Sequence, residues 1–270
     1  KFIFFIRYLL AIFFVAIILI LFIPQFFDYK NRLEIIKINL LQQYGLKINR
    51  IGDIKFRSFP SANLEIKDLS ASYYQKDNSM EIKKLIIYPK LLGLYDFKNF
   101  HIKKLKLEDS KLKIKLKNLN LLSKKISNLN KKIYLKDLNI EVIDNDKNVI
   151  VLKRINFYNY GYKKNILDGE VFDEKFKMSL KKNSQDINFI LYKTGISGNL
   201  RILNTFEDSL LKGVLKGKVL KSNFKLDFIY DGKAIQLNNF LFRDKELSFN
   251  SKGYYEIKPF SKITSTSEIK

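Results

Sequence analysis

The chain of 270 residues contains no cysteine, no tryptophan and one histidine, His101. Without cysteine it cannot form a disulfide scaffold, a zinc-finger array, a thiol-protease site or an iron–sulfur centre. One imidazole cannot provide a histidine cluster for a metal ion, and a histidine-based catalytic triad would depend on that single residue. These absences exclude the function classes that rest on cysteine or on several histidines.

Loops that bind phosphate or cations are also missing. The 11 glycines show neither Walker nor dinucleotide-binding spacing. Asp144 and Asp146 could begin a calcium loop, but position 155, which would have to carry its last acidic ligand, is isoleucine. A hairpin turn explains the same segment. Since no paired-carboxylate motif is present either, we expect no cofactor, no metal site and no catalytic residues, and we interpret the chain as non-enzymatic.

Acidic residues are scarce: 27 acidic against 50 basic side chains give a formal net charge of +23. Only seven of the basic residues are arginine, the side chain that nucleic-acid binders favour for its bidentate geometry. The lysines extend along nearly the whole chain and do not form one block. This distribution favours compositional drift over a dedicated polyanion site, and we do not expect nucleic acid as a partner.

Charge is almost absent from residues 2–23, where Arg7 is the only charged side chain. A helix of that length extends about 33 Å, enough to cross a hydrocarbon core of about 30 Å. No small-residue cleavage site follows; instead come Pro24 and the bulky pair Phe26 and Phe27. We therefore predict an uncleaved membrane anchor over residues 1–27. Basic residues flank both of its ends, so charge does not decide its orientation.

A short helix is expected to lead from the anchor into the body of the protein. Within residues 28–45, apolar side chains recur at helical spacing and Gly45 is in position to end the helix. A weaker helix signal covers residues 205–212, where Thr205 and Asp208 resemble a capping box.

From residue 46 onward the hydrophobic period changes to two, which predicts strands with one apolar and one charged face. Polar segments at residues 108–110, 144–148, 230–233 and 243–245 predict hairpin turns between them. We expect residues 46–204 to form an antiparallel amphipathic β domain and residues 205–270 a β-rich C-terminal segment. Because the chain begins with lysine and ends in a strand-like pattern, we also expect it to be a fragment at one or both ends.

The apolar face of such a sheet must be covered, and few helices are predicted to cover it. Either the sheet closes as a β-sandwich, or it curls into an open groove whose wall binds an apolar molecule. Periodicity alone does not choose, but a lysine-rimmed apolar groove beside a bilayer suits an anionic phospholipid and favours the open form. The candidate wall residues are Ile54, Phe56, Leu64, Ile66, Leu105, Leu107, Leu112, Ile114 and Leu116.

Several segments also occur in a characteristic order. After the N-terminal hydrophobic run and the short helix come residues 44–48 (YGLKI), 52–60 (GDIKFRSFP) and 63–72 (NLEIKDLSAS), in which a strand precedes a DL-S turn. Residues 85–89 (LIIYP), residues 101–107 (HIKKLKL) and a hairpin with a glycine strand in residues 223–259 follow. This order resembles the AsmA family of bacterial envelope proteins, which includes the TamB-like members.

The resemblance implies an anchor in the bacterial inner membrane, an extended β-rich groove in the periplasm, and a role in lipid transport or outer-membrane lipid homeostasis. It implies membrane phospholipids as partners and no catalytic residues. Two other functions stay open. One is an assembly factor for outer-membrane proteins whose sheet edge pairs with a client strand. The other is a binder of lipopolysaccharide or another polyanion that uses the lysine-rich face.

Overall fold

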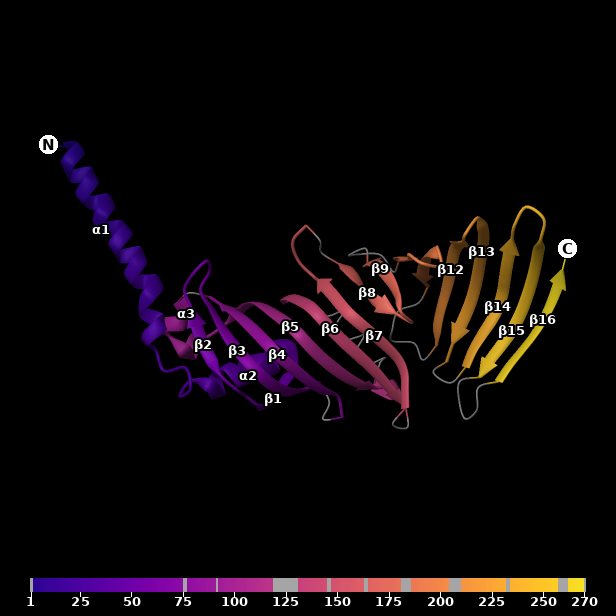
Figure 1. Ribbon diagram of the computed structural model, residues 1–270, viewed down its shortest axis with the longest axis horizontal. Coiled ribbons are helices and arrows are strands. Elements are labelled where there is room, and N and C mark those ends of the chain that lie inside the picture. The colour runs from indigo at the N-terminus through magenta and orange to yellow at the C-terminus, as the bar shows by residue number, and fades with distance from the viewer. Residues whose placement is uncertain are drawn as a thin grey trace. The chain divides into compact units, whose positions relative to one another are not determined.

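The computed structural model describes residues 2–74, 77–90, 92–118, 131–144, 147–162, 165–180, 186–203, 210–231, 234–256 and 262–269. These residues form one long apolar helix, several short helices and 16 strands (Figure 1). The chain divides into two compact units, Lys1–Val151 and Leu152–Lys270. The predicted mainly β fold with an apolar N-terminal helix is confirmed.

The long helix, α1, spans Phe2–Phe22 and is followed by a 3-10 turn, η1, at Ile23–Phe26. Pro24 lies in the first turn of η1, where a proline is tolerated, and it cannot continue the preceding helix. The segment Phe4–Phe26 is the one helix among the described residues that is long and apolar enough to cross a membrane, and its residues 4–20 are all exposed. These properties are consistent with a single-pass anchor.

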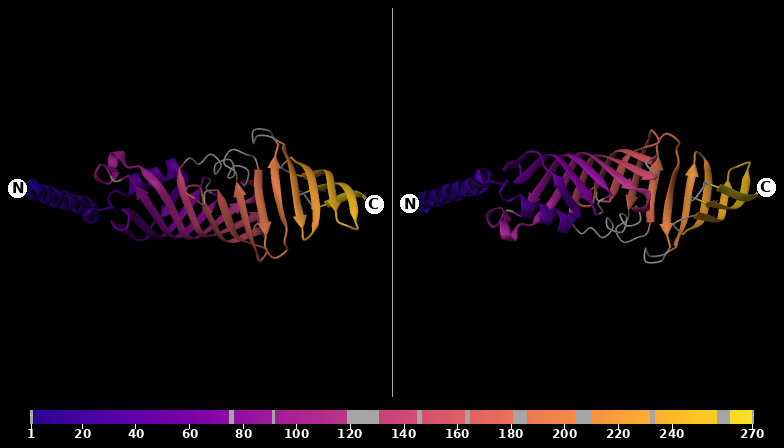
Figure 2. Two further views of the ribbon diagram at one scale, coloured as in Figure 1. Left: turned by 90° about the horizontal axis from the view of Figure 1, so that it is seen from above. Right: turned by 90° about the horizontal axis from the view of Figure 1, so that it is seen from below.

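The predicted short helix is α2, which spans Leu33–Tyr44. Gly45 ends it with a φ of 68°, and its N–H donates to the carbonyl oxygens of Leu40 and Leu41. This left-handed C-cap favours glycine because glycine has no Cβ. The helix is amphipathic in its burial: Leu40 is fully buried, whereas the adjacent Leu41 is 48% exposed. In both views of Figure 2, α2 lies against the strands of the first unit.

The remaining helical segments of the first unit are single turns. They are α3 at Leu92–Tyr95, η2 at Phe97–Asn99 and η3 at Leu116–Asn118.

Strands of the first unit are β1 (Leu46–Arg50), β2 (Ile54–Arg57), β3 (Asn63–Tyr73), β4 (Ser79–Pro89), β5 (Ile102–Lys115) and β6 (Lys132–Asp144). Strand β7, Lys147–Tyr158, begins in this unit and ends in the second. The hydrogen-bonded order is β1-β3-β4-β5-β6-β7, with β2 paired to β3. All of the pairings from β1 to β5 are antiparallel, whereas β5 and β6 are parallel. The sheet is therefore mostly, but not wholly, of the predicted antiparallel kind.

Two predicted turns are wrong, because the strands continue through them. Residues 108–110 lie inside β5, and the DL-S stretch that begins at Asp68 lies inside β3. Asp68 and Asp109 each have a φ of 49°, and Asp137 in β6 has a φ of 56°. Aspartate tolerates this left-handed conformation better than most residues. The register is kept on either side of Asp68, because Lys67 pairs with Lys84 and Leu69 with Ile82, so neither strand has an extra residue there. The aspartates therefore interrupt the pairing at one position and do not end the strands.

The apolar face of the first unit is covered by the protein itself. Leucine and isoleucine side chains of β3, β4 and β5 share this face and are at most 2% exposed: Leu64, Ile66, Leu69, Ile82, Leu85, Ile87, Leu105 and Leu107. Helix α2 contacts β1 and β5 and buries Ile36 and Leu40, and the segment 92–100 adds the buried Leu94 and Phe100. Each such side chain contributes about 1.5–3 kcal/mol when fully buried.

The opposite face of the same strands carries a ladder of ion pairs. Glu65 of β3 accepts from Nε of Arg57 at 2.8 Å, and Nζ of Lys84 lies 3.7 Å from the same carboxylate. Lys84 also pairs at 3.2 Å with Glu108 of β5, which pairs in turn with Lys106. Lys84 and Lys106 thus stabilise the sheet, because they pair with the buried or half-buried carboxylates of Glu65 and Glu108.

The second unit continues with β8 (Ile166–Val171), β9 (Glu174–Leu180), β10 (Asp186–Leu191), β11 (Ser197–Ile202), β12 (Leu211–Val219), β13 (Ser222–Tyr230), β14 (Ala234–Arg243), β15 (Ser248–Glu256) and β16 (Lys262–Ile269). Each strand pairs antiparallel with the next one in the chain. The turn predicted at 243–245 falls between β14 and β15. The turns predicted at 144–148 and 230–233 fall between β6 and β7 and between β13 and β14, and their residues 145–146 and 232–233 lie outside the described residues. Of the helix predicted at 205–212, residues 204–209 lie outside the described residues, and Leu211 and Lys212 belong to β12.

The sheet order begins at β1 and ends at β16 without closing. The predicted open sheet is therefore confirmed, and the alternative of a closed β-sandwich is wrong. The physical reason is visible in each unit: the first uses helices and loop residues to cover its apolar face, and the second has no facing sheet among its described residues.

Candidate functional site

The strands of the second unit place most of their apolar residues on one face. Residues that pair directly across antiparallel strands point to the same side of a sheet. Leu200, Leu215, Leu226 and Phe240 follow one another in this way across β11 to β14. The same register extends the row to Ile187 in β10. We call the resulting surface the open apolar face; its described members in β8 to β15 are Leu167, Val171, Phe176, Met178, Ile187, Phe189, Leu191, Leu200, Ile202, Leu215, Val219, Phe224, Leu226, Phe228, Tyr230, Ile235, Leu237, Phe240, Phe242, Phe249 and Tyr255.

The side chains of the open apolar face are half-buried, except that of Phe176, which is buried. They are neither covered, like those of the first unit, nor fully exposed, because neighbouring side chains on the same face shield one another. Among the described residues of Leu152–Lys270, every regular element is a strand, so no helix covers this face. In the views of Figure 2 the strands β12 to β16 follow one another as a single layer. This surface is therefore contiguous, apolar and accessible.

Glycines on this face let aromatic rings lie flat across the sheet. A Cβ atom placed on Gly217 would lie 2.6 Å from Cζ of Phe224, and one on Gly213 would lie 2.5 Å from Cζ of Phe228. Each ring thus occupies the space that a side chain on the opposite strand would fill, an arrangement known to stabilise glycine positions in sheets. The result is an apolar surface with few projecting side chains.

The other face of the second unit is polar. Lys212, Lys216 and Lys218 of β12 alternate with the apolar residues and are exposed. Nζ of Lys225 lies 3.0 Å from Asp227, and Nε of Arg201 lies 2.8 Å from Asp186. The unit is therefore amphipathic across its thickness, with its charges on the side away from the open apolar face.

Six of the nine predicted wall residues lie in the covered core of the first unit. Leu64, Ile66, Leu105, Leu107, Leu112 and Ile114 are at most 5% exposed. Leu116 lies in η3 and is half-buried. In this conformation a lipid chain could contact the six buried residues only if the elements that cover them moved. Their assignment to a lipid-binding wall stays a prediction with that condition attached.

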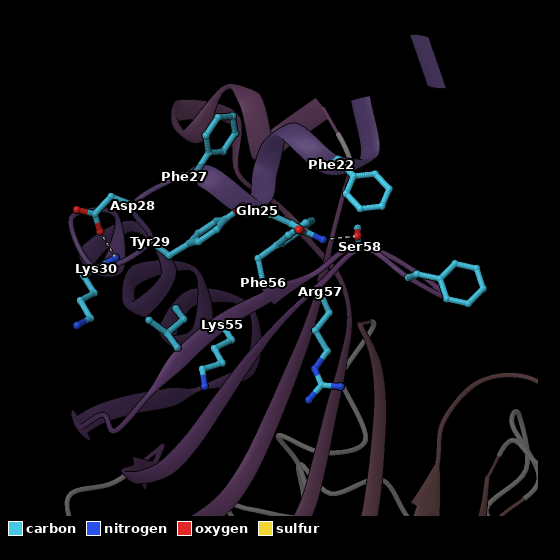
Figure 3. Close-up of a pocket in the computed structure, with 12 residues that line it drawn as sticks. Phe22, Gln25, Phe27, Asp28, Tyr29, Lys30, Lys55, Phe56, Arg57 and Ser58 are labelled. Carbon is cyan, nitrogen blue, oxygen red and sulfur yellow. Dashed lines mark hydrogen bonds between the residues drawn. The ribbon is translucent and has the colours of Figure 1, made fainter. Parts of the chain in front are cut away.

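The other two predicted wall residues, Ile54 and Phe56, lie in β2 and line a cavity of about 730 Å³ (Figure 3). Its remaining lining comes from the end of α1, the segment that follows it, and the end of β2: Phe22, Gln25, Phe27, Asp28, Tyr29, Lys30, Lys55, Arg57, Ser58 and Phe59. We call this cavity the juxtamembrane pocket, because Phe22 and Gln25 belong to the candidate membrane span. Sequence reasoning thus found two of its residues and missed the others.

Contacts around the juxtamembrane pocket fix its walls. The hydroxyl of Tyr29 donates to the carbonyl oxygen of Pro24 at 2.6 Å, and its ring stacks on that of Phe56 with centroids 5.7 Å apart. Burial raises the pKa of Tyr29, so this phenol stays protonated and keeps donating. Across the pocket, Nε2 of Gln25 donates to Oγ of Ser58 at 2.6 Å. The segment after α1 is therefore held against β2 at both sides of the cavity.

The open apolar face is the main feature that sequence reasoning did not select. Its signal was present, because residues 223–230 (NFKLDFIY) alternate as clearly as residues 111–117 (KLKIKLK). The hairpin there was predicted, but the sequence alone did not show that its apolar side would be left uncovered.

Within the described residues, no group of three or more histidine, cysteine, aspartate or glutamate side chains could hold a metal ion. Comparisons with protein-family models, with curated proteins and with solved structures find no match to this chain.

Proposed function

We propose that this protein is a membrane-anchored, non-enzymatic lipid-handling protein similar to the AsmA family, which binds phospholipid acyl chains on its open apolar face. In this proposal α1 anchors the chain in the bacterial inner membrane and the β-rich body lies in the periplasm. The protein contributes to lipid transport or to outer-membrane lipid homeostasis. The observation that carries the proposal is a contiguous, half-buried apolar face in a chain that also has a helix able to cross a bilayer.

The free energy of burying apolar surface favours an apolar ligand on the open apolar face. Removing apolar surface from water contributes about 25 cal/mol per Å², or about 0.8 kcal/mol for each methylene group. In the first unit this free energy is used in folding, because helix and loop residues cover the apolar face. In the second unit a large part of it stays available to a molecule that binds there. A chain of methylene groups fits such a surface, because the flat rings of Phe224 and Phe228 leave few projections.

The same geometry implies low selectivity for chain length. A selective pocket encloses its ligand and fixes it with a few polar groups, whereas the charged side chains of β12 and β13 point to the opposite face. Acyl chains would therefore bind by contact area alone and could shift along the strands without breaking hydrogen bonds. No chemical step is needed.

A matched pair of substitutions in β12 tests this proposal. Leu215 lies on the open apolar face and the adjacent Val214 on the polar face, and both are half-buried. Leu215→Asp puts a charge where the acyl chain would lie, and Val214→Asp puts the same charge on the other side. We expect the first variant to lose most of the phospholipid that co-purifies with the full chain, measured by native mass spectrometry, and the second to keep it. Equal retention in the two variants would contradict the proposal.

Photo-crosslinking from neighbouring positions of β14 identifies what the face contacts. A photoreactive phenylalanine in place of Phe242 lies on the open apolar face, and in place of the exposed Leu241 it lies on the polar face. The proposal predicts lipid adducts from position 242 and few from position 241. Protein adducts without lipid adducts would instead support the assembly-factor function, in which strands pair with a client protein.

A further inference from the structure

The juxtamembrane pocket lies where a lipid headgroup would be. Its lining begins at Phe22, in the last turn of α1, and continues through Gln25 and Phe27. The candidate membrane span ends at Phe26. If α1 crosses a bilayer, the pocket is therefore at the level of the polar headgroups, within about one helical turn of the end of the span.

Three cationic side chains, Lys30, Lys55 and Arg57, and one carboxylate, Asp28, line the pocket. The carboxylate of Asp28 is already engaged, because it accepts from the backbone N–H of Lys30 at 2.9 Å and from Nδ2 of Asn31 at 2.8 Å. The pocket is thus cationic.

The cations are able to accept a further anionic partner. Lys55 pairs with Asp53 at 3.1 Å, but the two side chains are 67% and 50% exposed, so water screens this pair and an anion can compete with it. Nε of Arg57 binds Glu65, and a guanidinium has five N–H donors, so this contact does not use up its capacity. Arginine and lysine together suit a phosphate, which accepts several hydrogen bonds at once.

Aromatic side chains line the pocket on the side of the membrane helix. Figure 3 shows Phe22 and Phe27 on the side from which α1 leaves, whereas Lys55 and Arg57 extend away from that side. Phe27 is held there by Arg32, whose guanidinium carbon lies 4.8 Å from the centre of the ring. Phe59, two residues after the end of β2, is 85% exposed. The pocket therefore has an apolar side toward the bilayer and a cationic side away from it, which matches the polarity of a phospholipid.

We propose that the juxtamembrane pocket binds the phosphate-bearing headgroup of an anionic phospholipid taken from the membrane that α1 crosses. Lys30, Lys55 and Arg57 contact the phosphate, and the aromatic side contacts the glycerol and the first methylene groups. This inference rests on the proposed function, and it adds a headgroup preference that the open apolar face cannot supply. It also places lipid capture at the membrane end of the chain.

The test compares two double variants of the full chain in detergent. Lys30→Gln/Lys55→Gln removes two charges from the pocket, and the control Lys47→Gln/Lys103→Gln removes two exposed charges of the same unit outside it. Native mass spectrometry measures the affinity for added phosphatidylglycerol and phosphatidylcholine. Because each lysine near an anionic lipid contributes about 1 kcal/mol, or about fivefold in affinity, we expect the pocket variant to lose roughly tenfold or more in phosphatidylglycerol binding. The control should change by less than about twofold.

Several outcomes would overturn this inference. Equal losses in the two double variants would mean that the overall charge of the surface, and not the pocket, attracts the lipid. Equal binding of phosphatidylglycerol and phosphatidylcholine by the wild-type chain would remove the headgroup preference. Displacement of phosphatidylglycerol by millimolar inorganic phosphate would show a site for the phosphate ion alone.

Photo-crosslinking at position 242 separates this inference from the proposed function. Lipid adducts at 242 without a headgroup preference would overturn only the inference about the pocket. A headgroup preference without lipid adducts at 242 would support the pocket and contradict acyl-chain binding on the open apolar face.

Discussion

The two units of this chain share one strand pattern but treat their apolar faces differently. In the first unit, α2 and the segment 92–100 pack on the sheet, and leucines such as Leu64 and Leu85 are fully buried. In the second unit, Leu215 and Leu226 have the same place in the alternation and stay half-buried. The difference lies in what covers the sheet. Strand periodicity therefore determines which side of a sheet is apolar. Elements distant in the sequence determine whether that side becomes part of the core or stays open as a binding surface.

The largest effect is expected from a substitution that detaches α2 from the apolar face of the first unit. Leu40→Asp introduces a charge on the fully buried side of α2, and Leu41→Asp introduces it on the exposed side. An unpaired buried charge typically costs 3–5 kcal/mol, so we expect Leu40→Asp to detach α2 and destabilise the first unit by at least about 3 kcal/mol. The control should stay within about 0.5 kcal/mol of wild type.

Hydrogen exchange of the backbone amides in β3, β4 and β5 reports this effect directly. Fast exchange in Leu40→Asp alone would confirm that α2 protects the first unit. If the amides of β3, β4 and β5 exchange at the same rate in both variants, α2 does not shield the apolar face of the first unit. The difference in burial between the two units would then have another cause.

A second test makes the same truncation in both units. Leu85→Ala leaves a cavity in a covered core and should cost about 2–5 kcal/mol of unfolding free energy. Leu226→Ala, on the open apolar face, should cost about 1 kcal/mol, because less apolar surface is lost and water can fill the space. Local unfolding followed by limited proteolysis of each unit measures both values. Similar costs would mean that the second face is covered in solution.

The smallest effect concerns the ion-pair ladder of the first unit. Burial opposes ionisation of Glu108, but hydrogen bonds and charges from Lys106 and Lys84 outweigh it and lower the pKa of this carboxyl below its ordinary value. A carboxyl whose pKa is lower in the folded state stabilises the fold above its unfolded pKa, and this contribution is lost as the pH falls through the folded value. Glu108→Gln should therefore destabilise the first unit by about 0.5–1 kcal/mol at neutral pH and not at all in strong acid.

Glu170→Gln is the matched change in the second unit. A hydrogen bond from Arg154 lowers the pKa of Glu170, but the Arg154 side chain is 65% exposed, so water and salt screen this pair more than the pairs of Glu108. Unfolding followed by circular dichroism between pH 2 and pH 7 compares the two variants. The contrast fails if Glu170→Gln produces the larger change with pH.

Much of the fold is readable from local sequence. The apolar run of α1, the glycine that ends α2 and the alternation of residues 223–230 each reflect interactions within a few residues. Asp109 is an example of a residue whose conformation cannot be predicted from its neighbours in the sequence. An aspartate between alternating residues fits a turn as well as a left-handed residue inside a strand, because aspartate tolerates the positive φ that both need. The residues on both sides of Asp109 pair in register with β4 and β6, which keeps the strand continuous, and that pairing is not local.

The candidate site is less predictable for the same reason. Ile54 and Phe56 were selected from strand alternation, but the juxtamembrane pocket exists only because residues 22–30 return to β2. Ile114 was selected on the same grounds and is 1% exposed. Periodicity finds apolar side chains correctly in both cases, and it carries no information about which of them a distant segment will cover.

The neighbour-to-neighbour pairing of β8 through β16 has a consequence for how this unit can change. Every contact between strands joins segments that are adjacent in the chain, so the contact order is low and zipper-like folding can begin at any hairpin. Stability then behaves nearly as a one-dimensional sum, as in solenoid proteins. A hairpin could be duplicated or deleted without changing how the other strands pair. Evolution could therefore lengthen or shorten such a sheet by two strands at a time.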